Sequence, residues 1–203
     1  DLLRPGRTEA QVAAELRELI LREHQAVDFI IVGSGPNGAN PHYDYGDRVL
    51  AEGEPVVVDI GGTLDSGYHS DCTRTYVVGG DVTAAPQDFQ EAWAVLEEAQ
   101  AAGRAAARPG ASTQAVDRAT RRVIAEAGWG EYYTHRTGHG IGLSTHEEPF
   151  IMEGNELQLA ESMCFSIEPG IYVPGQWGMR LEDIMVTTAS GSESLNCAPR
   201  EVR

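Results

Sequence analysis

Lysine is missing from this sequence, and all fifteen of its basic residues are arginines. A Walker-type phosphate loop, a Schiff base and a lysine general base are therefore excluded, since each needs a lysine amine. Thirty-one acidic residues leave a formal net charge of −16. Such a charge repels a phosphate backbone and an anionic membrane surface. We therefore expect neither nucleic acid nor a membrane as a partner.

Cysteines and long apolar runs are also scarce. Cys72, Cys164 and Cys197 are odd in number and far apart, which argues against a disulfide framework and against a CxxC zinc site. No apolar run approaches the roughly 20 residues of a membrane helix, and no signal peptide is visible. These features predict a cytoplasmic protein. A hydrophobic content of 41% over 203 residues predicts a well-buried core.

The first elements are a helix and a strand. Thr8 and Gln11 have the spacing of a capping box, which predicts a helix that runs to about Glu23. The β-branched run from Val27 to Val32 predicts a strand that stops at Gly33.

A GxGxxG pattern follows at residues 33–38, with Asp59 about twenty residues further on, and it imitates a dinucleotide-binding fingerprint. We reject this interpretation, because that motif needs a helix whose N-terminus faces the pyrophosphate. Residues 39–55 contain two prolines and two glycines and show no helical periodicity.

The chain repeats itself after a long helix that ends at residues 109–110. The triplet RPG at residues 4–6 recurs at residues 108–110, and Ser112 takes the place of Thr8 as the helix cap. The apolar positions of the following helix recur at the same offset. An internal duplication predicts two halves related by a pseudo-twofold axis, with a site on that axis.

Each half also offers a pair of acids on consecutive predicted strands. Asp59 lies in the strand at residues 56–62, and Asp71 follows twelve residues later in the strand at residues 68–78. Glu168 and Glu182, fourteen residues apart, occupy the corresponding strands at 162–170 and 179–186. All four acids follow or interrupt apolar runs, where an unpaired carboxylate is costly to bury. Four converging carboxylates raise one another's pKa, and two divalent cations would balance their charge.

The segment at residues 135–148 supplies histidines to the same site. His135, His139 and His146 lie four and seven residues apart, among glycines that prevent a regular helix. Taken alone, His135 and His146 are equally compatible with ordinary polar positions on strands. Four carboxylates with one imidazole, His139, suit Mn²⁺ or a similar first-row ion better than a structural zinc.

The complete set resembles the pita-bread metallopeptidases, the family M24 of methionine aminopeptidase, aminopeptidase P and prolidase. The resemblance rests on the motifs DIGG, SDCTRT, GHGIG, SIEPG and RLED, and it is strongest toward the Xaa-Pro branch. It implies an α+β pita-bread fold, in which helices of two pseudo-twofold-related halves pack on a curved antiparallel sheet. It implies a site for two divalent ions, with Mn²⁺ expected first and Co²⁺ or Zn²⁺ as alternatives. Its implied metal ligands are Asp59, Asp71, His139, Glu168 and Glu182, with Asp71 and Glu182 as the bridging pair.

The resemblance also implies roles for the remaining site residues. His42 and His146 match the histidines that contact substrate, while His135 and Arg180 match groups that support the ligands or bind a substrate carboxylate. The implied reaction is metal-assisted hydrolysis of the Xaa-Pro bond in a proline-containing dipeptide or oligopeptide. Glu168 would carry the proton to the prolyl nitrogen, and His146 would donate to the developing oxyanion.

Three departures from the family pattern bear on function. The interval from Asp59 to Asp71 is twelve residues, where many relatives have eleven. We expect residues 1–203 to form one catalytic domain, without the N-terminal domain that relatives use in dimerisation, so the resemblance allows a homodimer without fixing it. Residues 147–167 hold no arginine, so the carboxylate clamp of some dipeptidases is missing there.

Several functions therefore stay open at this point. An Xaa-Pro dipeptidase is slightly favoured by the motif wording over an Xaa-Pro aminopeptidase, or aminopeptidase P, that acts on longer peptides. A non-catalytic pita-bread binding module is the alternative of another class, but it would be expected to lose metal ligands. A metal-independent amidinohydrolase such as creatinase is disfavoured for the same reason.

Overall fold

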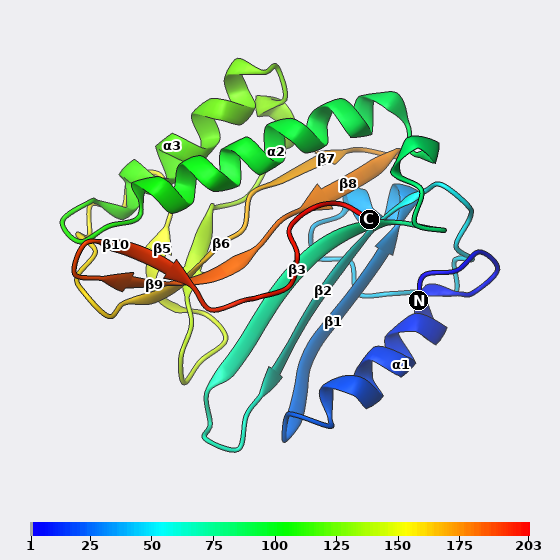
Figure 1. The fold of residues 1–203 in the computed structure, drawn as a ribbon, viewed down its shortest axis with the longest axis horizontal. Coiled ribbons are helices and arrows are strands. Elements are labelled where there is room, and N and C mark those ends of the chain that lie inside the picture. The colour runs from blue at the N-terminus through cyan, green and yellow to red at the C-terminus, as the bar shows by residue number, and fades with distance from the viewer. Residues whose placement is uncertain (1) are drawn as a thin grey trace.

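The structure is a computed structural model that describes residues 2–203, and it places two helices side by side over the strands (Figure 1). The two are α2 (Gln87–Ala106) and α3 (Thr113–Glu126), which pack against each other. Helix α1 (Glu9–Ile20) lies apart from them and packs against strand β1 (Ala26–Ser34). Every strand pairing is antiparallel, so the predicted α+β class is confirmed.

The first half of the chain forms a three-stranded sheet in the order β1-β2-β3, with β2 at Pro55–Thr63 and β3 at His69–Val77. The predicted strands at 27–32, 56–62 and 68–78 are confirmed within a few residues. The capping box is confirmed as well, because the Gln11 N–H donates to Thr8 Oγ1 while the Thr8 N–H donates to Gln11 Oε1. This box satisfies two backbone N–H groups at the start of α1.

The second half forms a five-stranded sheet in the order β10-β9-β6-β4-β5 and a two-stranded sheet of β7 and β8. The bounds of these strands are β4 Gly138–Gly140, β5 Glu147–Ile151, β6 Cys164–Ile167, β7 Gly170–Val173, β8 Trp177–Arg180, β9 Asp183–Thr188 and β10 Gly191–Ser194. Three short 3₁₀ helices lie in the connections, at η1 Gly35–Ala39, η2 Val82–Ala84 and η3 Gly130–Tyr132.

The segment after β1 agrees with the rejection of the dinucleotide-binding interpretation. The chain passes from β1 into η1 and then into a loop that reaches β2 at Pro55. Residues 35–54 therefore contain no α-helix whose N-terminus a pyrophosphate could occupy.

The internal repeat is visible as a repeated local contact. The Gly6 N–H donates to the Leu50 carbonyl at 3.0 Å, and the Gly110 N–H donates to the Leu159 carbonyl at 2.8 Å. Both leucines are almost completely buried. Each half thus ties the turn before its first helix to a loop in the same way, which supports the predicted duplication.

The strand predicted at residues 179–186 is wrong in one respect, since it is broken at Leu181 and Glu182. The Leu181 N–H donates to the Pro169 carbonyl, and the Glu182 N–H donates to the Thr73 carbonyl of β3 at 3.2 Å. The chain therefore leaves β8, touches the sheet of the first half, and only then enters β9. This break carries Glu182 to the junction of the two halves.

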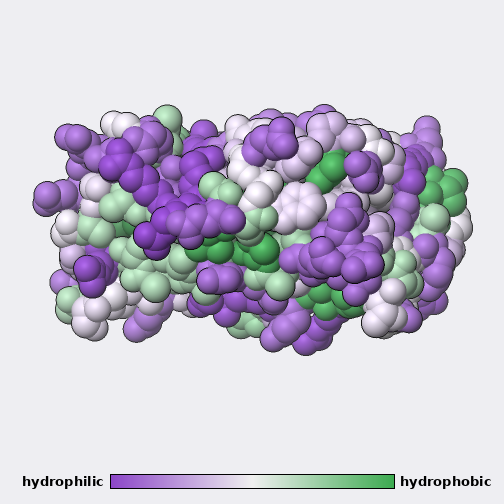
Figure 2. All heavy atoms as spheres, turned by 90° about the horizontal axis from the view of Figure 1, so that it is seen from above, coloured by the Kyte–Doolittle hydropathy of each residue, from purple (hydrophilic) through white to green (hydrophobic). Residues whose placement is uncertain are grey.

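The hydrophobic core lies in three clusters, one under each helix. One packs α1 on β1 and β2, one packs α2 on β7 and β8 around Phe89 and Trp177, and one packs α3 on β5 and β6 around Phe165. The face seen from above is mainly hydrophilic, with small hydrophobic areas between polar ones (Figure 2). Among residues 2–203, no helix combines the length and the hydropathy needed to cross a bilayer.

Glu9 is a completely buried carboxylate at the first position of α1. It accepts hydrogen bonds from the backbone and hydroxyl of Ser34, from the side chains of Asn37 and Tyr43, and from the backbone N–H of Gly46. All distances lie between 2.6 and 3.2 Å. All of these partners donate to the carboxylate, so Glu9 ties α1 to η1 and to the loop at residues 40–46.

We predict that Glu9→Gln destabilises the fold by about 2–3 kcal/mol, because the new amide N–H₂ would face donors and leave them unpaired. Urea unfolding of the two proteins measures the difference. Glu18→Gln, on the exposed face of the same helix, is the matched control and should change stability by less than about 0.5 kcal/mol. Equal effects of the two substitutions would contradict the role of Glu9.

Candidate metal centre

Asp59 and Asp71 project from neighbouring strands onto the same face of the first sheet. In the register of β2 and β3, Asp59 lies opposite Thr73, and Gly61 lies opposite Asp71. Residues two apart on a strand share a face, so the two aspartates are diagonal neighbours. Both are more than nine-tenths buried, with exposed fractions of 8% and 6%. Gly61, which lies opposite Asp71 and two residues after Asp59, has no side chain that could separate the two aspartates.

His139 enters the site from β4, between two glycines that allow close packing. A Cβ at Gly138 would lie 1.9 Å from the Ser166 carbonyl oxygen, and one at Gly140 would lie 2.3 Å from the Glu148 carbonyl oxygen. The GHG sequence thus lets β4 fit between its neighbours. The Nδ1 of His139 lies 3.0 Å from the Gly140 carbonyl and therefore carries a proton, and Nε2 faces the acids.

The two glutamates complete the cluster from the second half. Glu168 follows β6, and its Oε1 lies 3.2 Å from His139 Nε2 and accepts from Ser166 Oγ at 3.0 Å. Glu182 lies in the break after β8 and accepts from Thr73 Oγ1 at 2.8 Å. Donor atoms of Asp71, His139 and Glu182 lie within 4.8 Å of one another. The structure thus brings the five predicted ligands to the junction of the two halves.

Three oxygens of this cluster are buried without a hydrogen-bond donor among residues 2–203: Asp59 Oδ1, Asp71 Oδ1 and Glu182 Oε1. Burial, followed by the charge of neighbouring acids, raises the pKa of Asp71 and of Glu182 well above the ordinary values. Buried carboxylate oxygens are normally satisfied, and a divalent cation would satisfy these three and restore ionisation. The residues present therefore fit a metal centre.

Glu168 behaves differently from its two neighbours. Burial raises its pKa, but the hydrogen bond and charge of His139, with His135 and Arg180, outweigh burial and lower the pKa to about 2. Glu168 is thus an ionised carboxylate at neutral pH, and its side chain remains 16% exposed. Glu168 lines the cavity together with Asp59, Asp71 and Glu182.

Arg180 supports the acids. Its Nη2 donates to Asp59 Oδ2 at 2.7 Å and its Nε donates to Thr73 Oγ1 at 3.1 Å. Its Nη1 donates to the Tyr172 hydroxyl at 2.8 Å and to the Pro41 carbonyl at 3.1 Å. Arg180 is only 3% exposed, so its guanidinium is buried and its N–H groups donate to protein acceptors.

His135 closes a hydrogen-bond chain that begins at Arg180. Its Nδ1 lies 2.7 Å from the Arg136 carbonyl and must be protonated, so its Nε2 accepts from the Tyr172 hydroxyl at 2.9 Å. Burial lowers the pKa of His135 to about 4, and at pH 7 the ring is therefore neutral. This chain of hydrogen bonds fixes the side chains of Tyr172 and His135 on one wall of the site.

The remaining predicted residues line the same cavity, which has a volume of about 440 Å³. His42 and His146 are exposed, and the ring of His146 lies 4.2 Å from that of His139 between centroids. A larger cavity of about 560 Å³, under α1, is mainly apolar and contains none of the predicted site residues. Sequence reasoning missed several side chains of the site cavity, which are Phe29, Ile31, Asp44, Arg136 and Met152.

The loops that carry His42 and His135 are each anchored on a buried acid. Glu9 binds the loop of His42, as described above. In the second half Asp117, which is fully buried on α3, accepts from Thr137 Oγ1 at 2.7 Å and pairs with Arg121 at 3.0 Å. Arg121 in turn donates to the His135 carbonyl at 2.9 Å. Both halves thus position a site histidine with a buried acid of their first helix.

Comparison with known proteins agrees with this geometry. The pattern of metallopeptidase family M24 matches residues 1–189. The chain belongs to this family. As an M24 member it is 55% identical to a probable dipeptidase PepE of Mycobacterium tuberculosis, over 100% of this chain and 53% of the relative. It is 40% identical to an Xaa-Pro dipeptidase of Lactobacillus helveticus, over 100% of this chain and 55% of the relative.

The solved structures confirm the predicted pita-bread fold. The crystal structure of dipeptidase PepE from Mycobacterium ulcerans matches with a TM-score of 0.95 and 55% identity, over 99% of this chain and 53% of that chain. The M24 chain thus spans about half the length of the relatives it matches. The family is one of metallopeptidases, which act with divalent metal ions, so the predicted membership and the predicted class of cofactor are confirmed.

The depressed pKa of His135 predicts a pH dependence of stability. In the metal-free chain the folded state resists protonation of His135 down to about pH 4, whereas the unfolded state takes up the proton near pH 6.5. Stability should therefore be lost as pH falls from 6.5 to 4, by up to about 3 kcal/mol from this group. We expect a shallower loss in His135→Gln, measured by urea unfolding across that range with a chelator present. Parallel curves for the two proteins would contradict the assignment.

Proposed function

We propose that residues 1–203 are the catalytic domain of a divalent-metal-dependent Xaa-Pro dipeptidase. The observation that carries this proposal is the convergence of three unpaired buried carboxylate oxygens, with His139 and Glu168, on one cavity. The names of the relatives support a dipeptidase, and a cavity of about 440 Å³ suits a ligand of dipeptide size.

The proposed ligands of two metal ions are Asp59, Asp71, His139, Glu168 and Glu182. Because four of the five are carboxylates, we propose Mn²⁺ as the ion, with Co²⁺ and Zn²⁺ as the alternatives to be tested. When bound, the ions would polarise the scissile carbonyl and lower the pKa of the attacking water. A cytoplasmic location and a homodimer remain predictions from the sequence and the resemblance.

The side chains themselves would orient the peptide and move the proton. Glu168, ionised and partly exposed, would accept the proton of the attacking water and deliver it to the prolyl nitrogen as the amide bond breaks. Burial, together with the charges of His139 and Arg136, lowers the pKa of His146, so its ring is neutral near pH 7. A neutral ring keeps one N–H, which would donate to the oxyanion that develops on the scissile carbonyl.

The apolar wall of the cavity favours proline after the scissile bond. Phe29 and Ile31 are two residues apart on β1 and therefore share a face, and Met152 lines the same cavity. A prolyl ring is apolar and lacks the N–H of other residues, so shape and apolar contact would select it. His42, on the loop anchored by Glu9, would contact the substrate from the same side as Pro41.

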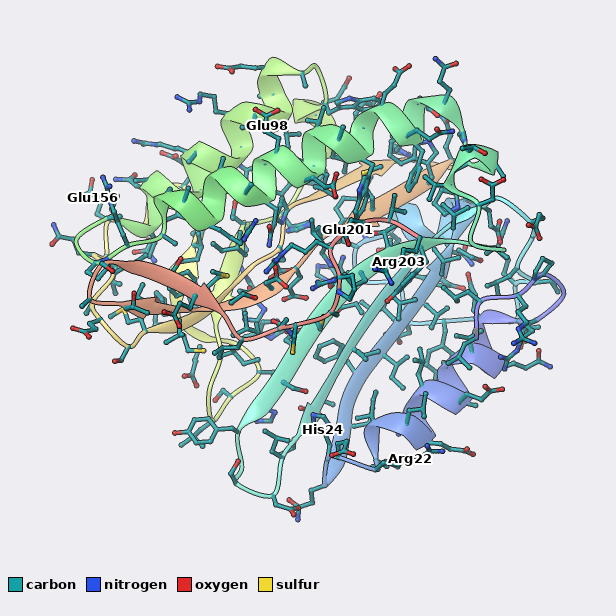
Figure 3. The ribbon with its side chains drawn as sticks, in the orientation of Figure 1. Arg22, His24, Glu98, Glu156, Glu201 and Arg203 are labelled. Carbon is teal, nitrogen blue, oxygen red and sulfur yellow. The ribbon has the colours of Figure 1, made fainter. Side chains whose placement is uncertain are left out.

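The test is hydrolysis of Ala-Pro, Ala-Pro-Ala and Ala-Ala by the chelator-stripped chain, with each of Mn²⁺, Co²⁺ and Zn²⁺ added back. We expect metal-dependent cleavage with Ala-Pro preferred. Glu168→Gln should lower kcat by about 10²–10⁴-fold. The matched control is Glu98→Gln, an exposed acid on α2 in the helix layer, which should leave kcat unchanged (Figure 3).

Each other outcome identifies an alternative. A preference for Ala-Pro-Ala would indicate an Xaa-Pro aminopeptidase instead of a dipeptidase. A chain that takes up no metal and hydrolyses none of the three peptides would contradict the peptidase and would favour a pita-bread binding module.

A further inference from the structure

Two arginines, Arg136 and Arg180, line the site cavity. They differ in how many hydrogen-bond acceptors the protein offers to their guanidinium groups. Arg180 uses its guanidinium for Asp59, Thr73, Tyr172 and Pro41, as described above. It therefore has little capacity left to hold a substrate carboxylate. A substrate anion in this cavity needs another cation.

Arg136 is that cation. Its Nε is buried without a hydrogen-bond acceptor, and the part of the chain that the structure describes holds no carboxylate within 4.0 Å of its guanidinium. This is unusual in a chain with a net charge of −16, where acids outnumber arginines two to one. A buried donor without an acceptor costs free energy, so a ligand that supplies an acceptor would be favoured.

The guanidinium of Arg136 is held in place by an aromatic ring. Its Cζ lies 5.2 Å from the centroid of Phe150, within the range of a cation–π contact. Phe150 lies on β5, inside the segment at residues 147–167 that holds no arginine. The positive charge missing from that segment is thus supplied by Arg136, which rests on it. Arg136 and His146, the residue proposed to face the scissile carbonyl, line the same cavity.

We propose that Arg136 binds the C-terminal carboxylate of a dipeptide substrate and so selects dipeptides over longer peptides. The inference rests on the proposed peptidase function. In a dipeptide the free carboxylate lies one residue beyond the scissile carbonyl, so a cation on the wall of the same cavity is suitably placed. A guanidinium pairs with a carboxylate through two parallel N–H donors. A longer peptide would offer a neutral carbonyl in its place and would leave the guanidinium poorly matched.

The test compares Ala-Pro with Ala-Pro-amide, which differs only in lacking the charged carboxylate. We expect the metal-loaded chain to prefer Ala-Pro, and we expect Arg136→Gln to lower the ratio of the two kcat/KM values by about 10- to 100-fold. Arg136→Lys keeps the charge but loses the paired donors, so it should lower the ratio less. Arg118→Gln removes the same charge from an exposed ion pair with Glu153 and should leave the ratio unchanged.

An unchanged ratio in Arg136→Gln would overturn the inference, whatever the absolute activity of the variant. If the chain hydrolyses neither peptide, the peptidase proposal fails, and calorimetric titration of the metal-loaded chain with the same two peptides then tests Arg136 alone. Tighter binding of Ala-Pro than of its amide, lost in Arg136→Gln, would support the carboxylate site. Equal binding of the two peptides by the unsubstituted chain would refute it.

Discussion

Repulsion among buried carboxylates is the constraint on which this structure depends. Asp59, Asp71, Glu168 and Glu182 come from both halves of the chain and meet at the junction between them. Arg180 supplies the nearby positive charge, His139 Nε2 lies 3.2 Å from Glu168, and Thr73 donates to Glu182. Three carboxylate oxygens still lack a donor among the described residues. The fold thus holds acids in a geometry that solvent and hydrogen bonds do not balance, and a divalent metal centre explains that geometry.

The duplicated architecture explains how acids so far apart in the chain are aligned. In each half, a glycine before the first helix bonds the same kind of buried leucine, and a buried acid of that helix anchors a loop with a site histidine. Glu9 serves the loop of His42, and Asp117 with Arg121 serves that of His135. Helices α1 and α3 therefore hold the loops that form part of the cavity wall. Preorganised walls are what a site that orients a peptide needs.

The acids that would meet could be predicted from sequence, because Asp59 and Asp71 lie on paired strands and the repeat offers a second pair of acids in the other half. The hydrogen-bond partners of the site residues could not be predicted from the sequence. Tyr172 joins Arg180 to His135 through the separate hairpin of β7 and β8, and no spacing in the sequence indicates that contact. The sequence also gives no sign that the strand predicted at residues 179–186 is interrupted at Glu182, because the apolar residues around Glu182 continue the pattern of a strand. Arg136 was overlooked, since only tertiary packing on Phe150 shows its unpaired guanidinium.

The most direct measurement is metal binding by the chelator-stripped chain. Mn²⁺, Co²⁺ or Zn²⁺ is added, and binding is measured in two ways, as the metal content of the chain and as the change in its thermal unfolding. The account predicts about two ions per chain and a rise in Tm of about 5–10 °C at a hundredfold excess over Kd, because the ions bind only the folded acids. Asp71→Asn, which removes one acid of the cluster, should lose most of that rise. A chain that takes up none of these ions, and whose Tm does not change in their presence, would contradict the central claim.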